Sequence, residues 1–129
     1  MRSGRLTGRE AEELCAGYLR GKGYTILERN YVCRGGELDI VAEQPGNTGL
    51  RRMLMGSGQG YLVFVEVKYR SGDMYEPREA VGYRKQQRLR LAAQAWIAEH
   101  GMRYQPRFDV IEVRTEGGEP RFNHFENAF

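Results

Sequence analysis

Between positions 62 and 68 the chain reads Leu62-Val63-Phe64-Val65-Glu66-Val67-Lys68. Its apolar residues are mostly β-branched or aromatic and continue without alternation, which is typical of a strand covered on both faces. We therefore expect this strand at the centre of a sheet. Side chains alternate along a strand, so Glu66 and Lys68 point to the same face. Each charge costs several kcal/mol on a central strand, on the order of ionic desolvation penalties, and requires an explanation.

Two interpretations of Glu66 and Lys68 are open: an ion pair where the strand frays into solvent, or a chemical site. Asp39 favours the site, because it lies in a second apolar strand that is expected to pair with the first. Carboxylates that converge from neighbouring strands repel each other, and a divalent cation relieves the repulsion. Hard oxygen ligands suit Mg²⁺ or Mn²⁺, and the backbone carbonyl of Val67 is a further candidate ligand. With Lys68 orienting a water molecule, such a site would hydrolyse a phosphodiester.

Periodicity and turn residues place the other elements around this centre. The spacing of Thr7 and Glu10 predicts a capping box at the start of the first helix. The expected elements are helices over 8–20 and 78–100 and strands over 24–31, 37–42, 62–68, 108–113 and 122–125. The order α-β-β-β-α-β-β indicates an α/β fold, a mixed central sheet flanked by helices, in a single domain over residues 1–129. Residues 44–60 are expected to form a long, mobile insertion, either disordered or touching nucleic acid through Arg51 and Arg52.

Bulk properties limit the settings in which the protein works. The chain has 129 residues, a formal net charge of +3 and a sequence pI of about 9.0, which is compatible with a polyanionic partner. No apolar run approaches the roughly 20 residues that span a bilayer, and the N-terminus lacks the apolar stretch of a signal peptide. We therefore expect a cytoplasmic protein with no membrane partner. Cys15 and Cys33 lack a CxxC spacing, so neither a disulfide framework nor a zinc site is indicated.

Basic residues form a candidate nucleic-acid surface. Arg84, Lys85 and Arg88 fall in the N-terminal half of the second long helix, and Arg70 follows the central strand. A positive rim of this kind binds phosphates without reading sequence. A solvated helix face rich in arginine explains the same residues equally well. Nothing in the chain resembles a base-reading element, so recognition is expected to depend on nucleic-acid structure, such as a branch, a flap or a single-stranded end.

Several motifs match one known family over nearly the whole chain. They include Gly8-Arg9-Glu10-Ala11, Gly36-Glu37-Leu38-Asp39, Phe64-Val65-Glu66-Val67-Lys68 with Arg70, Arg107-Phe108-Asp109-Val110-Ile111 and Asn127-Ala128-Phe129. In this order they resemble the bacterial YraN-like family of predicted endonucleases. Glu66-Val67-Lys68 with the upstream Asp39 also resembles the PD-(D/E)xK signature of restriction-endonuclease-like nucleases. The chain departs from the family pattern at residues 44–60, where the usual connection is a short turn.

The resemblance implies a restriction-endonuclease-like fold, similar to that of archaeal Holliday junction resolvases, and by analogy a nuclease that depends on Mg²⁺ or Mn²⁺. Asp39, Glu66 and Lys68 match the catalytic core of that superfamily. Glu10 matches the helical acid that completes the metal site in resolvase-like relatives, although the capping box explains Glu10 equally well. Glu37 is either an acid that supports the metal site or a strand-entry residue.

The resemblance also bears on partners. The expected substrate is nucleic acid. DNA is expected rather than RNA, although the sequence does not decide between them. A homodimer follows from the likeness to resolvases, because cutting two strands of a junction requires two sites. The alternative function is a nucleic-acid-binding module that keeps the nuclease fold without catalysis; its binding would depend on salt and would survive replacement of Asp39.

Overall fold

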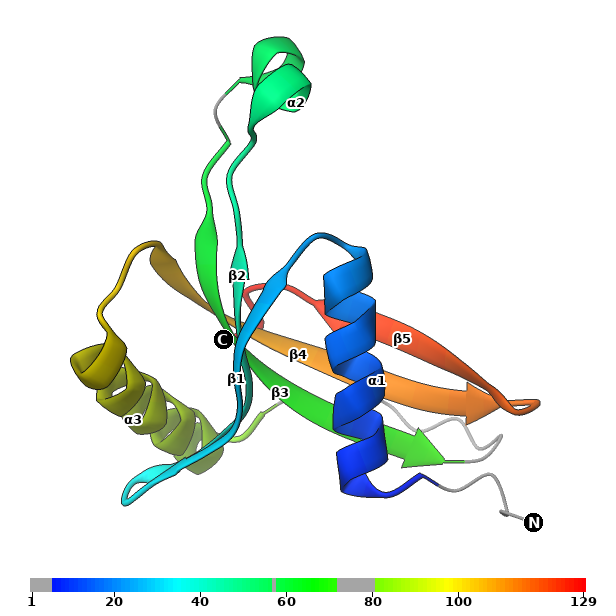
Figure 1. The fold of residues 1–129 in the computed structure, drawn as a ribbon. Helices are drawn as coiled ribbons and strands as arrows, with labels where there is room; N and C mark the ends of the chain where they lie inside the picture. Colours follow the sequence, from blue (N-terminus) through cyan, green and yellow to red (C-terminus); the bar gives the residue numbers. More distant parts are fainter. Residues whose placement is uncertain (1–5, 57, 72–80) are drawn as a thin grey trace.

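The structure is a computed structural model that describes residues 6–56, 58–71 and 81–129. Its centre is a five-stranded sheet in the order β1-β2-β3-β4-β5, in which β3 and β4 are parallel and the other neighbours are antiparallel (Figure 1). The elements are α1 Gly8–Gly21, β1 Thr25–Cys33, β2 Gly36–Gln44, α2 Gly49–Met55, β3 Tyr61–Ser71, α3 Tyr83–His100, β4 Gln105–Glu116 and β5 Glu119–Phe125. A parallel pair needs a long crossover, which α3 supplies. The predicted α/β class with a mixed sheet flanked by helices is confirmed.

β3 lies at the centre of the sheet and is covered on both faces, as predicted. On one face Phe64 belongs to the same buried cluster as Trp96 of α3. On the other face Val65 packs in a cluster with Leu19 of α1. Figure 1 shows α1 and α3 at separate positions around the sheet. The uninterrupted apolar run of β3 is therefore the result of burial under two helices.

The two long helices differ in how well their starts are predicted. α1 has the expected capping box: Thr7 Oγ1 accepts from the Glu10 N–H at 3.1 Å, and Glu10 Oε1 accepts from the Thr7 N–H at 3.0 Å. For α3 the predicted start at Arg78 lies outside the described residues, but Gly82 is the extended N-cap, so the helix begins at Tyr83. Glycine is a poor helix former, which accounts for the later start. No helix in this described part of the chain has both the length and the apolar character to cross a membrane.

The connection between β2 and β3 contains a helix that the sequence did not predict. α2 lies at the far end of the connection and projects away from the sheet (Figure 1). The long insertion expected between these strands therefore contains a helix that was not expected, and the element order is α-β-β-α-β-α-β-β. α2 buries none of its residues and has no side-chain hydrogen bond at its N-cap. It therefore lacks both features by which a helix is recognised in a sequence, a buried stripe and a capping residue.

β2 and β3 separate partway along their length. Their pairing runs from Gln44 opposite Tyr61 to Ile40 opposite Val65, although β2 begins at Gly36 and β3 continues to Ser71. Figure 1 shows the β1–β2 hairpin turning toward α3, while β3 continues beside β4. We call the unpaired ends, residues 36–39 of β2 and 66–71 of β3, the fork. Backbone groups that face each other across the fork are left without strand partners, and other groups must satisfy them.

A local change in strand geometry places Asp39 in the fork. Leu38 packs in the cluster that contains α3, whereas Ile40, two residues further on, packs in the cluster that contains α1. Strict alternation would put both on one face of the sheet. Asn30 lies between the β1 residues that pair with Leu38 and Ile40, and its φ of 54° is in the left-handed region. The β1–β2 pair therefore twists sharply at Asp39, so that β2 residues before and after this position point to opposite faces of the sheet.

Candidate active site

Asp39 is attached to β3 by a hydrogen bond across the fork. The Val67 N–H donates to Asp39 Oδ2 at 2.8 Å, in place of the backbone acceptor that continued strand pairing would provide. The carboxylate therefore lies next to the Glu66–Lys68 segment, as expected from the neighbouring strands. Hydrogen bonding from a backbone N–H also fixes the rotamer of Asp39, so the remaining oxygen is presented in a defined direction.

Burial and the negative charge of Glu66 raise the pKa of Asp39 to about 7. Glu12 raises the pKa of Asp39 further, while the Val67 N–H and the ammonium of Lys85 oppose the rise. Glu66 itself is only 8% exposed. Ionising both carboxylates costs free energy, because they lie close together and little solvent screens their charges. The fork therefore has an excess of buried negative charge, which a cation would relieve.

Lys85 of α3 supplies part of this positive charge. Its Nζ lies 2.8 Å from Glu66 Oε1, and the hydrogen bond to Glu66 raises the pKa of Lys85. The sequence placed Lys85 on an outer rim that contacts nucleic acid. In the structure its ammonium is instead directed into the site, although the side chain remains half exposed. The ammonium thus neutralises the carboxylate that is expected to bind metal.

The acid that α1 contributes near the fork is Glu12, two residues beyond the predicted Glu10. The side chain of Glu10 closes the capping box with Thr7, so this interpretation of Glu10 is confirmed. Glu12 instead acts on the pKa values of both Asp39 and the buried Cys15. Its Oε1 is buried and has no hydrogen-bond partner among the described residues. One sequence signal was overlooked: Glu12 is one helical turn before the buried Ala16 and so shares the sheet-facing side of α1.

Lys68 and a second missed acid, Glu112, face each other on β3 and β4. Lys68 is opposite Glu112 in the parallel register. Glu112 is 2% exposed, and its Oε2 has no hydrogen-bond partner in the described part of the chain. Arg70, two residues beyond Lys68, likewise has a buried Nε and Nη2 without partners among the described residues. The polar face that begins at Glu66 therefore extends over two strands. Glu112 interrupts an apolar strand just as Glu66 does, and this was the signal that could have revealed it.

Asp39 and Glu66 are the two carboxylates that come closest to forming a metal site. Among the described residues no three Asp, Glu, His or Cys side chains converge closely enough to hold an ion together. A cation at the fork would therefore rely on these two carboxylates and on backbone oxygen, such as the carbonyl of Val67. Glu37 is exposed at the start of β2 and raises the pKa of Lys85 only as a minor influence, so it lies at the margin of the site.

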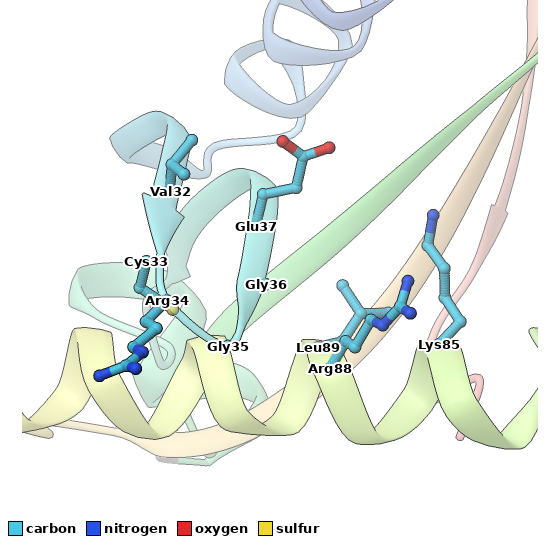
Figure 2. A pocket seen from close by; sticks show the side chains of 9 residues that line it. All are labelled: Val32, Cys33, Arg34, Gly35, Gly36, Glu37, Lys85, Arg88 and Leu89. Atoms are coloured by element: carbon cyan, nitrogen blue, oxygen red, sulfur yellow. The ribbon is translucent and has the colours of Figure 1, made fainter.

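The remaining predicted basic residues lie on the surface beside the fork. Arg84 and Arg88 are exposed on the first two turns of α3. Arg88 and Lys85 also line a pocket of about 540 Å³ between α3 and the tip of the β1–β2 hairpin (Figure 2). The basic residues that were predicted to form one rim therefore lie in different environments. Arg84 and Arg88 face solvent, Lys85 reaches Glu66, and Arg70 is partly buried at the end of β3.

A five-stranded mixed sheet flanked by helices, with acids and lysines gathered where its strands separate, is broadly consistent with a nuclease-like fold. The chain belongs to the family described as "Uncharacterised protein family UPF0102", whose model matches residues 11–113. This confirms the YraN-like membership that the motifs predicted. A UPF0102 protein of Syntrophotalea carbinolica is 47% identical over 124 residues, covering 95% of this chain and 89% of the relative. One from Pelobacter propionicus is 42% identical over 128 residues, covering 97% and 83%.

The crowding of carboxylates leads to a prediction about stability. Asp39→Asn keeps an oxygen to accept from the Val67 N–H but removes one of the repelling charges. We expect the variant to be more stable than the wild type at pH 7 by about 1 kcal/mol, because functional sites commonly carry such strain. Urea denaturation without divalent metal measures it, with Glu43→Gln on the same strand as control. A clear loss of stability would show that the charge of Asp39 is satisfied within the fold.

Proposed function

We propose that this protein is a metal-dependent endonuclease that hydrolyses phosphodiester bonds in structured nucleic acid, most simply branched or flapped DNA. The observation that carries the proposal is the placement of Asp39 and Glu66 at the fork, with Lys68 on the same strand face as Glu66. A protein that needed only stability would gain from apolar residues at these positions. The buried acids are therefore better explained by chemistry than by packing.

The residues at the fork fit Mg²⁺ or Mn²⁺. Their donor atoms are hard oxygens, from Asp39, Glu66 and the carbonyl of Val67. The raised pKa of Asp39 and the ammonium on Glu66 both indicate a place where positive charge is stabilised. When bound, a divalent ion would lower the pKa of a water molecule and neutralise charge on the phosphate.

The protein's own groups would perform the remaining tasks. Lys68 donates hydrogen bonds from its ammonium, so it would orient the attacking water or stabilise charge on the phosphoryl oxygens. Asp39 is held in one orientation by the Val67 N–H, which keeps the geometry of the site preorganised. Arg84 and Arg88, exposed on α3 beside the fork, would bind phosphates that flank the cut without selecting a sequence.

A panel of labelled oligonucleotides tests the proposal. Junctions, flaps, single strands and duplexes are incubated with Mg²⁺ or Mn²⁺ and with wild type, Asp39→Asn or Lys68→Met. We expect the wild type to cut at least one branched or flapped substrate, and Lys68→Met to lower the rate by about 10²–10⁴-fold. Glu43→Gln is the matched control and should cut normally. The proposal fails if the wild type cuts none of them, or if the variants cut as well as it does.

One observation favours the alternative of a non-catalytic binding module. Lys85 already neutralises Glu66 at 2.8 Å, as it would in a scaffold that has no use for metal. Such a module would bind the same oligonucleotides with strong salt dependence, and Asp39→Asn would bind them equally well. The panel separates the two functions, because only the endonuclease produces metal-dependent fragments.

The ion pair of Lys85 leads to a second prediction. If Lys85 competes with metal for Glu66, Lys85→Met should bind Mn²⁺ more tightly, by about tenfold, since a close positive charge is removed. Isothermal titration calorimetry at low ionic strength measures the affinity. Arg84→Met, one position away and exposed, is the control for a general change in surface charge. Equal Mn²⁺ affinities for the two variants would show that Lys85 and the metal do not share Glu66.

A further inference from the structure

The pocket between α3 and the β1–β2 hairpin has the charge of an anion site. Arg34, Lys85 and Arg88 contribute three cations to its lining, against the single lining carboxylate of Glu37, and one of the three, Lys85, is paired with Glu66. Figure 2 shows Lys85 and Arg88 rising from α3 on the side of Glu37, whereas the guanidinium of Arg34 lies on the far side of the hairpin turn and points away from them. The cations that share the hollow beside Glu37 are therefore Lys85 and Arg88, both on α3. Phosphate groups are the natural ligands of such an arrangement.

The pocket is also partly apolar. Leu89 and Val32 contribute to its lining, and Leu89 is almost fully buried whereas Val32 is 70% exposed. A volume of about 540 Å³ falls in the usual range for sites that hold a small organic ligand. A lining with cations and apolar side chains can contact the two parts of a nucleotide, its charged phosphate and the apolar face of its base.

Close backbone packing keeps the walls in place. A Cβ atom on Gly36 would lie 2.8 Å from the Arg88 carbonyl oxygen, and one on Gly35 would lie 3.2 Å from Leu91 Cβ. The hairpin turn therefore rests directly on α3, with no room for a side chain between them. A pocket whose walls are already fixed loses less conformational entropy when a ligand enters.

Lys85 connects the pocket to the fork. It lines the pocket, and its ammonium lies 2.8 Å from Glu66 Oε1. A nucleotide in the pocket would therefore be next to the phosphate that the fork is proposed to cleave. A base within a duplex is covered by its partner and its stacked neighbours, so only an unpaired or extruded nucleotide can enter a concave site.

We infer that this pocket binds one unpaired nucleotide beside the scissile phosphate, and that it selects branched or flapped nucleic acid over continuous duplex. The inference rests on the proposed function for the position of the cut, but the binding itself needs no catalysis. Arg88, beside Lys85, holds the phosphate, and the base lies against the exposed Val32. Selection by an unpaired nucleotide requires no base-reading element, in agreement with the expected recognition of structure.

Binding of a fluorescent flap oligonucleotide tests the inference. The flap carries 2-aminopurine at its first unpaired position, and titrations are done in EDTA with wild type, Arg88→Ala and Val32→Glu. We expect the wild type to change the 2-aminopurine fluorescence and to prefer the flap to a duplex of equal length. Each variant should reduce that preference by about tenfold, because Arg88→Ala removes the phosphate contact and Val32→Glu replaces the apolar contact to the base with a negative charge. Arg103→Ala, exposed in the segment between α3 and β4, is the matched control.

Several outcomes decide the matter independently of cleavage. If the variants weaken flap and duplex binding equally, the pocket is only part of a general positive surface and the inference is overturned. An unchanged fluorescence on saturation with wild type also overturns it. If selective binding is found in a protein that never cuts, the pocket stands and the proposed endonuclease does not.

Discussion

Glu66→Gln is expected to abolish metal-dependent cleavage, with a loss of at least about 10³-fold in kcat, the scale of removing a main electrostatic contact in a catalytic site. Glu66 is the group on which the site converges: it faces the ammonium of Lys85, raises the pKa of Asp39 and precedes Lys68 on one strand face. The neutral amide would be a weaker ligand for a hard cation and would no longer neutralise Lys85. Single-turnover cleavage of the best flap or junction substrate, over a range of Mn²⁺ concentrations, measures the loss.

The fold should survive this change. Glutamine has nearly the same volume as glutamate and relieves the repulsion with Asp39, so the unfolding midpoint in urea should not fall. Glu43→Gln, at the other end of β2, should retain full activity. Normal cleavage by Glu66→Gln would remove the chemical role of Glu66 and leave it as the partner of an ion pair. Loss of activity together with loss of the folded state would count against a specific role as well.

Asp109→Asn is expected to destabilise the protein by about 3–5 kcal/mol, the cost of breaking a buried charge network. Asp109 is fully buried, and the Arg107 guanidinium donates to its oxygens at 2.9 and 2.8 Å. His124 Nε2 lies 2.7 Å from Asp109 Oδ2, and the Asn127 N–H donates to Oδ1 at 3.0 Å. This network joins β4 to the C-terminal segment. An amide there would leave the buried Arg107 with only the half-exposed Glu126, 3.9 Å from its Nη1, as a counter-charge. Urea denaturation at pH 7 measures the change, with Glu119→Gln, exposed in β5, as control.

The lowered pKa of Asp109 determines how the stability of the protein depends on pH. Burial alone would raise the pKa of Asp109, but the hydrogen bonds from His124 and Arg107 and from the Asn127 backbone outweigh it and hold the pKa below its ordinary value. The unfolded chain therefore takes up a proton at higher pH than the folded chain does. The contribution to stability is complete above the ordinary aspartate pKa and is lost as the pH falls through the folded value.

Two-state unfolding of the wild type and of Asp109→Asn between pH 6 and roughly pH 2.5, spanning ordinary aspartate pKa values, tests this dependence. The difference in stability between the two proteins should shrink toward acid. If Asp109→Asn does not fold, the milder His124→Phe variant provides the comparison, since it removes one of the hydrogen bonds that lower the pKa of Asp109. A difference that stays constant over this range would contradict the role assigned to the network.

Some features follow from local patterns along the chain. The unbroken apolar run of β3 predicted a central, doubly covered strand because burial on both faces removes alternation. The spacing of Thr7 and Glu10 predicted the start of α1, since a capping box involves only residues within one turn. The class of the fold and the neighbourhood of Asp39 with β3 also follow from such patterns. α2 was missed because it buries nothing, and a helix without a buried face leaves no periodic signal.

Other features exist only in the folded chain. The fork arises where the β2–β3 pairing stops at Ile40 and Val65, and no residue type marks that point. Glu12, Lys85 and Glu112 come from three different elements, and only tertiary packing brings them toward Asp39 or Lys68. Sequence spacing gives the direction of a side chain relative to its own strand or helix, whereas electrostatic coupling depends on distances between elements. For that reason the sequence showed which residue types form the site. Which of these residues contact one another was decided by the separation of β2 from β3.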